Sequence, residues 1–129
     1  MTLCSFLALS VILATHNPFE SKEEFLKAGW EFVFEAPEDS DDRLAFVRLG
    51  DAQVMLGIDS KEFLPDGAGD FKGAGIDIYV EFRENGIIET VYKNHVMAGA
   101  AIEKLEPKPW GVKAFHARIC GYKFLLAGK

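Results

Sequence analysis

The chain has 129 residues, a length that suits one domain of ordinary size. Hydrophobic residues make up 49% of it and charged residues 26%, a composition that excludes an intrinsically disordered chain. Twenty Asp and Glu residues outnumber fourteen Lys and Arg residues, giving a net charge of −6. A general nucleic-acid binder needs a basic face to neutralise phosphates, so this charge argues against that class and is compatible with a cationic ligand.

The N-terminus begins with an apolar run over residues 3–14. The run is too short to cross a bilayer, and no Lys or Arg precedes it as in a signal peptide. We expect a strand over 7–13 that is buried on both faces, in a cytoplasmic protein with no membrane partner. Cys4 and Cys120 lack the CxxC spacing of a zinc knuckle. A disulfide between them is geometrically allowed, but two separate thiols are the favoured prediction.

The first half of the chain predicts one helix followed by three strands. Asn17 and Pro18 are typical of a helix start, and Gly29 of its end. The segment 30–35 alternates apolar and acidic residues, which predicts a half-buried strand with Trp30, Phe32 and Phe34 on one face. After an acidic loop over 37–43, strands are expected over 44–49 and 52–58, joined by a tight turn.

The second half repeats this order. We expect a strand over 76–82, a helix over 86–98, a strand over 101–106, and a final hairpin of strands over 112–119 and 122–127. The chain thus contains an internal repeat of about 70 residues, each unit β-α-β-β-β. The predicted fold class is α+β, one domain in which module 1 covers about 1–58, a linker about 59–74 and module 2 about 75–129.

Three short segments resemble one known family. They are GIDIYVE at 75–81, KPWGVKAF at 108–115 and GYKF at 121–124. In this order and spacing the chain resembles the vicinal oxygen chelate superfamily, which contains glyoxalases, dioxygenases and bleomycin resistance proteins. The last turn departs from the family pattern, because Ile119-Cys120 replaces its acidic residues. The resemblance implies two modules with curved mixed sheets that form a cup, and a homodimer with modules paired within one chain or exchanged between two.

The resemblance also implies where a metal would bind. Enzymes of the superfamily hold a divalent metal with side chains from the first, fourth, fifth and eighth strands, which correspond here to Leu9, Met55, Asp77 and Leu125. Three of these four residues cannot serve as His or carboxylate ligands, and Asp77 alone cannot hold a transition metal. The chain therefore resembles most the metal-free bleomycin resistance branch, with no cofactor, no metal site and no catalytic residue expected.

The candidate ligand-binding residues are one carboxylate and a set of aromatic side chains. Asp77 lies in an apolar segment and shares a face with Tyr79 and Glu81. The alternative to contact with a ligand is an ion pair between Asp77 and Arg48 or Arg118. The aromatic candidates can stack on a flat ligand or pack in the core: Phe32, Phe34, Phe46, Trp110 and Phe115. The three histidines share no metal-ligand spacing, so each is expected on the surface or hydrogen-bonded.

Three function classes remain after these observations. The first is a non-enzymatic protein that sequesters a small aromatic compound, cationic or neutral, in a groove. The second is a metal-dependent lyase, isomerase or dioxygenase of the same superfamily, with His116 and either Asp77 or Glu81 as unexpected ligands. The third is a degenerate dimeric structural or interaction protein whose cup is filled by its own side chains. The sequence identifies no specific ligand, because one fold supports many functions.

Overall fold

The computed structural model describes residues 10–36, 43–58, 73 and 75–129. The first half comprises β1 (Val11–Thr15), α1 (Pro18–Lys27), β2 (Glu31–Glu35), β3 (Leu44–Leu49) and β4 (Ala52–Ile58). The second half comprises β5 (Ile78–Phe82), α2 (Ile87–Met97), β6 (Glu106–Pro107), β7 (Lys113–Ile119) and β8 (Tyr122–Gly128). The repeated β-α-β-β-β order and the α+β fold class are therefore confirmed.

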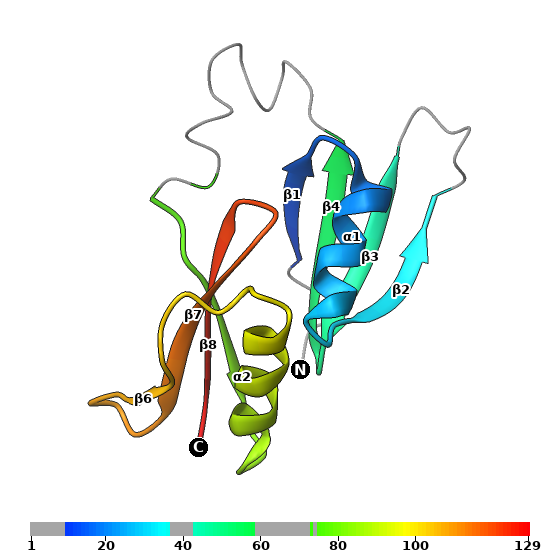
Figure 1. Ribbon diagram of the computed structural model, residues 1–129. Coiled ribbons are helices and arrows are strands. Elements are labelled where there is room, and N and C mark those ends of the chain that lie inside the picture. Colours follow the sequence, from blue (N-terminus) through cyan, green and yellow to red (C-terminus); the bar gives the residue numbers. More distant parts are fainter. Residues whose placement is uncertain (1–9, 37–42, 59–72, 74) are drawn as a thin grey trace, which may run out of the picture.

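Each half forms one four-stranded mixed sheet, and the two sheets have the same topology (Figure 1). The strand orders are β1-β4-β3-β2 and β5-β8-β7-β6. The strand before each helix pairs in parallel with the last strand of its own half, and the other pairs are antiparallel. This topology places β1 and β2 at the edges of the first sheet, and β5 and β6 at the edges of the second.

Several local predictions are confirmed residue by residue. The Asn17 side chain caps α1 by accepting a hydrogen bond from the Phe19 N–H at 3.1 Å, with Pro18 in the first turn. The hairpin of β3 and β4 has the predicted bounds. The turn between β7 and β8 needs left-handed backbone at two positions, with φ of 55° at Cys120 and 82° at Gly121, so glycine suits the second position.

A register shift in β2 makes one prediction wrong. Phe32 lies opposite Val47 of β3, but Phe34 lies opposite Phe46, so an irregularity falls between the two phenylalanines. Because side chains alternate along a strand, one inserted residue turns them to opposite faces of the sheet. Trp30 precedes the strand and is buried in the core. The three aromatic residues therefore do not form one wall.

Two strand predictions also differ from the structure. The strand expected over 101–106 is reduced to a single bridge between Ala101 and Ala117 and the two-residue β6. Pro107 limits this edge pairing because proline has no N–H to donate. The first strand begins only at Val11, and the expected residues 7–9 lie outside the described part. It is not buried on both faces, since Ile12 is 64% exposed.

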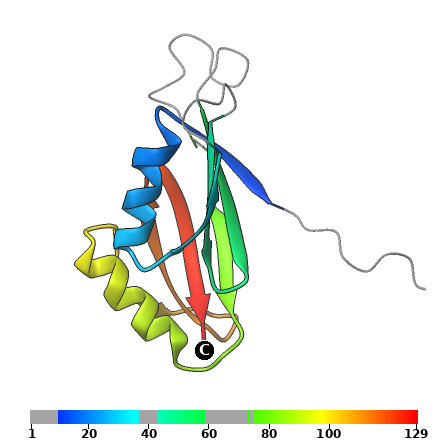
Figure 2. The same ribbon diagram turned by 90° about the vertical axis from the view of Figure 1, so that its right-hand side faces the viewer.

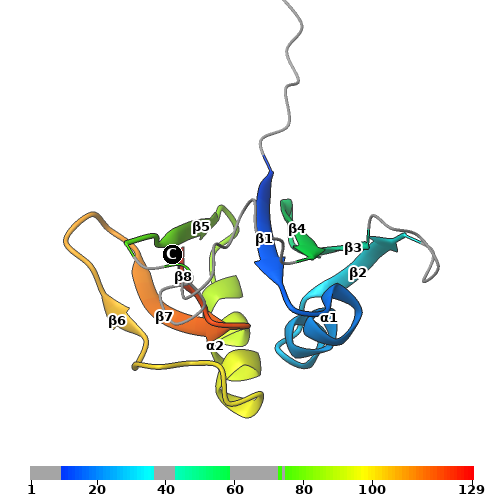
Figure 3. The ribbon, with the colours of Figure 1, turned by 90° about the horizontal axis from the view of Figure 1, so that it is seen from above.

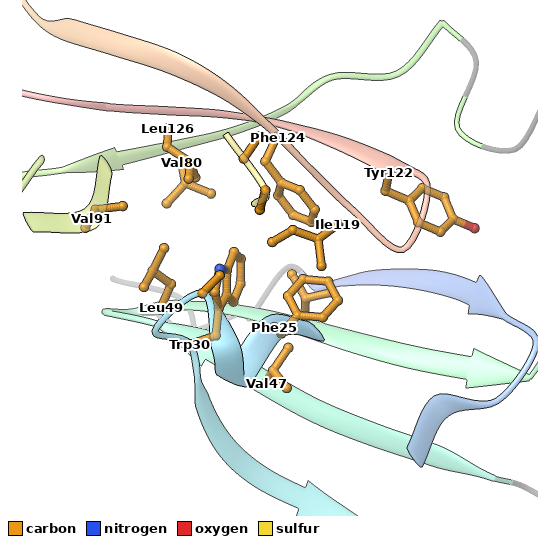
Figure 4. Packing of buried hydrophobic residues seen from close by; sticks show 14 of the residues in the cluster. Phe25, Trp30, Val47, Leu49, Val80, Val91, Ile119, Tyr122, Phe124 and Leu126 are labelled. Carbon is orange, nitrogen blue, oxygen red and sulfur yellow. The ribbon is translucent and has the colours of Figure 1, made fainter. Parts of the chain in front are cut away.

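The main core lies between the helix sides of the two sheets. Figures 2 and 3 show both helices on one side of the strands, with the sheets curving away to either side of them. In Figure 4 the buried side chains of the two sheets point toward one another. Phe25, Trp30 and Phe124 pack edge-on around a common centre, with ring centroids 5.0–5.8 Å apart. Phe25 and Trp30 come from the first half and Phe124 from the second, so one core joins both halves.

Each sheet keeps one face that no helix covers, here called the first free face (β1–β4) and the second free face (β5–β8). Because the helix sides face the common core, the two free faces point outward from it. One chain therefore does not close them around a common groove. No helix in the described part of the chain is long and apolar enough to cross a membrane.

We predict that Phe124→Ala destabilises the protein by about 3–5 kcal/mol, because it removes a fully buried ring that contacts both halves. Urea denaturation followed by circular dichroism measures this change. Val96→Ala is the matched control: Val96 is half exposed on α2, so its loss should change stability by less than about 0.5 kcal/mol. Equal effects of the two substitutions would contradict a core shared by the halves.

Candidate functional site

The first free face is apolar. The strand registers bring Ile12 of β1, Met55 of β4 and Phe46 of β3 into one row across the sheet. Phe34 extends the row from β2, with its ring edge-on to that of Phe46 at 5.9 Å. Large side chains on this face remain accessible, and Ile12 and Phe34 are more than half exposed. Such a contiguous accessible apolar surface is typical of a binding site or an interface.

A cavity of about 480 Å³ lies at the β1 edge of this face. Among the described residues its wall is aliphatic and aromatic, with Arg43 as the one charged residue. The lining residues are Val11, Ile12, Leu13, Ala14, Arg43, Leu44, Met55, Gly57, Ile58, Gly73, Ile76 and Tyr122. Gly73, Ile76 and Tyr122 follow β4 in the chain, and the Tyr122 hydroxyl donates to the Ala14 carbonyl at 2.7 Å. The position of the second half therefore helps to shape the cavity.

The second free face carries an aromatic and acidic network. The Trp110 indole N–H donates to the Tyr79 hydroxyl at 3.2 Å, and that hydroxyl donates to Glu81 Oε1 at 2.6 Å. Burial raises the pKa of Tyr79 above its ordinary value and the bond to Glu81 raises it further, whereas the bond from Trp110 lowers it. Glu81 thus holds the phenol as a donor, and the phenol orients the indole.

The same contact covers part of the sheet. Trp110 lies between β6 and β7, whereas Tyr79 belongs to β5, so their hydrogen bond crosses β7 and β8. On this face Ala114 of β7 and Ala127 of β8 are fully buried in a small cluster apart from the main core. The network leaves the residue Trp110 55% exposed, so a flat ligand can stack on its indole.

A second network places His116 between two carboxylates. Its Nε2 lies 2.8 Å from Asp77 Oδ2, its Nδ1 contacts Glu103 Oε1, and its backbone N–H donates to the same Glu103 oxygen at 2.8 Å. A neutral imidazole has one N–H, so a neutral His116 ring can donate to only one of the two carboxylates. Burial alone would raise the pKa of Glu103, but the hydrogen bonds from His116 outweigh it and hold the pKa below its ordinary value.

The structure brings the predicted site residues together only in part. Phe34 and Phe46 meet on the first free face, and Asp77 and Trp110 belong to the networks of the second. Phe32 turns to the helix side of its sheet, where Lys22 Nζ lies 4.9 Å from its ring centroid.

The prediction that Phe115 contacts a ligand in a groove is corrected, because its ring is fully buried in the core. It packs edge-on against Tyr92 and His95 of α2. Alternation along β7 is the reason: its neighbour His116 points to the free face, so Phe115 must point to the helix. The same alternation could have been applied to the sequence.

Other residues of the site were missed for different reasons. Tyr79 and Glu81 were expected to share the face of Asp77, but their hydrogen bonds could not be foreseen. Glu103 carries no sequence signal, since its partner His116 is distant in the chain. For His95 the hydrogen-bonded alternative is confirmed, since its ring is buried on α2 between the Trp30 indole and the Val91 carbonyl.

The positions that correspond to the metal ligands of related enzymes are apolar where the structure describes them, except for Asp77. Met55 lies on the first free face and Leu125 on the second, while Leu9 lies outside the described residues. Asp77 contacts His116 instead. Among the described residues there is no group of three or more His, Cys, Asp or Glu side chains that could hold a metal ion.

Comparisons with solved structures support the fold. TioX from Micromonospora sp. ML1 is 20% identical, with a TM-score of 0.68, and 95% of this chain and 96% of that chain are covered. A member of the glyoxalase/bleomycin resistance protein/dioxygenase superfamily from Sphaerobacter thermophilus is 21% identical, with a TM-score of 0.67 and coverage of 96% and 98%. A bleomycin resistance determinant encoded on the transposon Tn5 is 13% identical, with a TM-score of 0.66 and the same coverage. No family model and no curated protein matches the sequence. The resemblance to this superfamily is therefore confirmed as a likeness of fold.

We predict that His116→Ala raises the pKa of Glu103, because the substitution removes the ring that stabilises the carboxylate while burial still opposes its charge. A carbon-detected NMR titration of the Glu side chains measures the shift. Glu89 is the internal control, since a hydrogen bond from Lys113 holds its pKa low at a separate place. Its titration should stay constant in His116→Ala and move upward in Lys113→Ala; an unmoved Glu103 would contradict the network.

Proposed function

We propose that this protein is a non-enzymatic small-molecule binding protein that captures an aromatic compound. The observation that carries the proposal is the apolar cavity of about 480 Å³ at the β1 edge of the first free face. Its volume falls in the range of about 300–1,000 Å³ that is usual for sites that take drug-sized molecules. Arg43 is the one charged residue in the part of the wall that the structure describes, so this part favours apolar surface over a charged substrate.

Affinity in such a site comes from burial of apolar surface, which contributes about 25 cal/mol per Å² of area removed from water. Met55 contributes to this wall at a position where superfamily enzymes have a metal ligand. Function then means stoichiometric capture, in which the protein lowers the concentration of the free compound. The chain shares its fold with the Tn5 bleomycin resistance determinant, and because one fold supports many functions the proposal rests on the cavity rather than on this likeness.

We propose further that the protein acts as a homodimer in the cytoplasm. Because the two free faces of one chain point outward, a groove with two walls needs the first free face of one copy opposite the second free face of another. Phe34 and Phe46 would supply the apolar wall. Trp110 would stack on the ligand and Asp77, with Glu81, would favour positive charge on it. Phe32 and Phe115 have no part in this site.

A degenerate dimer without a ligand is the alternative that a specific observation favours. The Trp110–Tyr79 hydrogen bond already covers part of the second free face and buries apolar side chains beneath it. A protein whose groove is filled by its own side chains would need no ligand. A metal-dependent enzyme finds less support, because both ring nitrogens of His116 face carboxylates in the described structure.

Native mass spectrometry of the purified protein tests these alternatives. We expect a dimer that carries a stoichiometric organic mass and no metal. Stoichiometric Mn, Fe, Ni or Zn would overturn the non-enzymatic proposal in favour of an enzyme. A bare dimer that also fails to bind any member of a library of aromatic compounds would favour the degenerate form.

We predict that Ala14→Phe weakens binding of the neutral dye Nile red about tenfold, a loss of about 1.4 kcal/mol, because the new ring occupies the cavity. Fluorescence titration measures the affinity. Val96→Phe adds the same ring on the outer side of α2, away from the cavity, and should leave the affinity unchanged. Equal affinities in all three proteins would place the dye elsewhere and remove the cavity as the site.

We also predict that Asp77→Ala and Trp110→Ala weaken binding of a flat cationic dye, thioflavin T, without unfolding the protein. The carboxylate of Asp77 is partly exposed, so its loss should cost about threefold in affinity. Nile red carries no charge and should respond to Trp110→Ala but not to Asp77→Ala. Unchanged thioflavin T affinity in both variants would remove the second free face from the site.

A further inference from the structure

His95 is the one titratable side chain in the described structure that is completely buried in the core. Its Nδ1 lies 2.7 Å from the Val91 carbonyl, and its Nε2 lies 3.1 Å from the Trp30 indole nitrogen. A carbonyl can only accept and an indole N–H can only donate. The proton must therefore sit on Nδ1, and Nε2 must be bare. These two contacts specify the neutral imidazole.

The Trp30–His95 hydrogen bond lies at the junction of the two halves. Trp30 follows α1 in the first half, and His95 belongs to α2 in the second. Among the described residues it is the only fully buried side-chain hydrogen bond between the halves. The same indole packs against Phe124 at 5.4 Å, at the centre of the shared core that Figure 4 shows.

The two halves also approach closely beside this bond. Gly29 has a φ of +97°, and a Cβ built on it would lie 2.9 Å from Asn94 Nδ2 of α2. A side chain at residue 29 would therefore require the Asn94 side chain to move. His95 itself is fully buried, so water does not reach the ring to solvate a charge introduced on it.

No charged group in the described structure is buried beside His95 to balance such a charge. Titratable side chains lie on every element around it. They are Glu20, Lys22, Glu23, Glu24 and Lys27 of α1, Glu31 after Trp30, Glu89, Tyr92 and Lys93 of α2, Lys113, His116 and Arg118 of β7, and Tyr122 and Lys123 of β8. The charged ones among them are all at least partly exposed, and Thr15 and His95 are the only buried polar residues described. Glu89 is paired with Lys113, and His116 points to the opposite face of β7.

We propose that the His95–Trp30 pair is an acid-sensitive latch between the two halves of the chain. Protonation of Nε2 puts an N–H against the indole N–H and a positive charge into the aromatic core. The core between the halves then opens, while the hydrogen-bonded strands of each sheet stay paired. Since Ile76 and Tyr122 line the cavity from the second half, opening would also distort the cavity; the latch itself does not depend on the proposed function.

The direction of the pH effect follows from burial. The pKa of His95 lies below its ordinary value of 6.5 because burial disfavours the imidazolium, although the hydrogen bond to Val91 acts in the opposite sense. When a folded-state pKa is lowered, the stabilisation is complete above the unfolded-state value and is lost as the pH falls below it. The latch is therefore closed at pH 7.5 and opens on the acid side of about 6.5.

The test uses the full chain with Trp110→Phe, so that Trp30 is the only tryptophan. We expect its fluorescence emission to shift to longer wavelength as the pH is lowered from 7.5 to 5, while far-UV circular dichroism is retained. The same chain with His95→Gln keeps a side-chain acceptor that does not titrate, and its emission should stay constant over this range. His116→Gln is the matched control and should keep the transition.

Two results would overturn the latch. One is a transition that persists unchanged in His95→Gln, because another group would then cause it. The other is loss of far-UV circular dichroism at the same midpoint, because acid would then unfold the whole chain. If His95→Gln fails to fold, nitrogen NMR of the unsubstituted protein replaces it: the Nδ1–H tautomer must be seen at pH 7.5 and must titrate at the midpoint of the emission change.

Discussion

The shared aromatic core of Phe25, Trp30 and Phe124 is the contact on which the rest of the structure depends. Each half presents one sheet side and one helix to it, so the two halves bury much of their apolar surface against each other. Packing the helix sides together leaves the other side of each sheet uncovered. The outward direction of both free faces is therefore a consequence of how the core forms. It is the reason why the groove we propose between them would need a second copy.

The two free faces differ in chemistry although the halves share one topology. The first is apolar and borders the cavity, whereas the second carries two hydrogen-bonded networks with three carboxylates. A repeat preserves which positions face outward, but it does not preserve the residues at those positions. If two copies pair as proposed, the ligand meets an apolar wall on one side and an acidic, aromatic wall on the other. That arrangement suits a flat molecule whose positive charge lies toward one edge.

Histidine has two opposite environments in this chain. His95 is held neutral by a donor and a carbonyl in the core, whereas both ring nitrogens of His116 face carboxylate oxygens on the second free face. Neither environment follows from the neighbouring residues in the sequence, since the decisive partners are Trp30, Asp77 and Glu103. The surroundings of both histidine rings are therefore set by contacts between elements that are distant in the chain.

The sequence by itself determined the repeated β-α-β-β-β order, the cap at Asn17 and the bounds of β3 and β4, because helix capping and alternation are local properties. It also indicated that Asp77, Tyr79 and Glu81 share a face. Only the tertiary structure decided which side of each sheet is covered. The shift in β2 separates Phe32 from Phe34, the alternation of β7 sends Phe115 inward, and the pairing of β6 shortens to two residues. A register shift or an edge pairing depends on the neighbouring strand, and a buried hydrogen bond depends on a residue far away in the chain, so local sequence patterns cannot specify them.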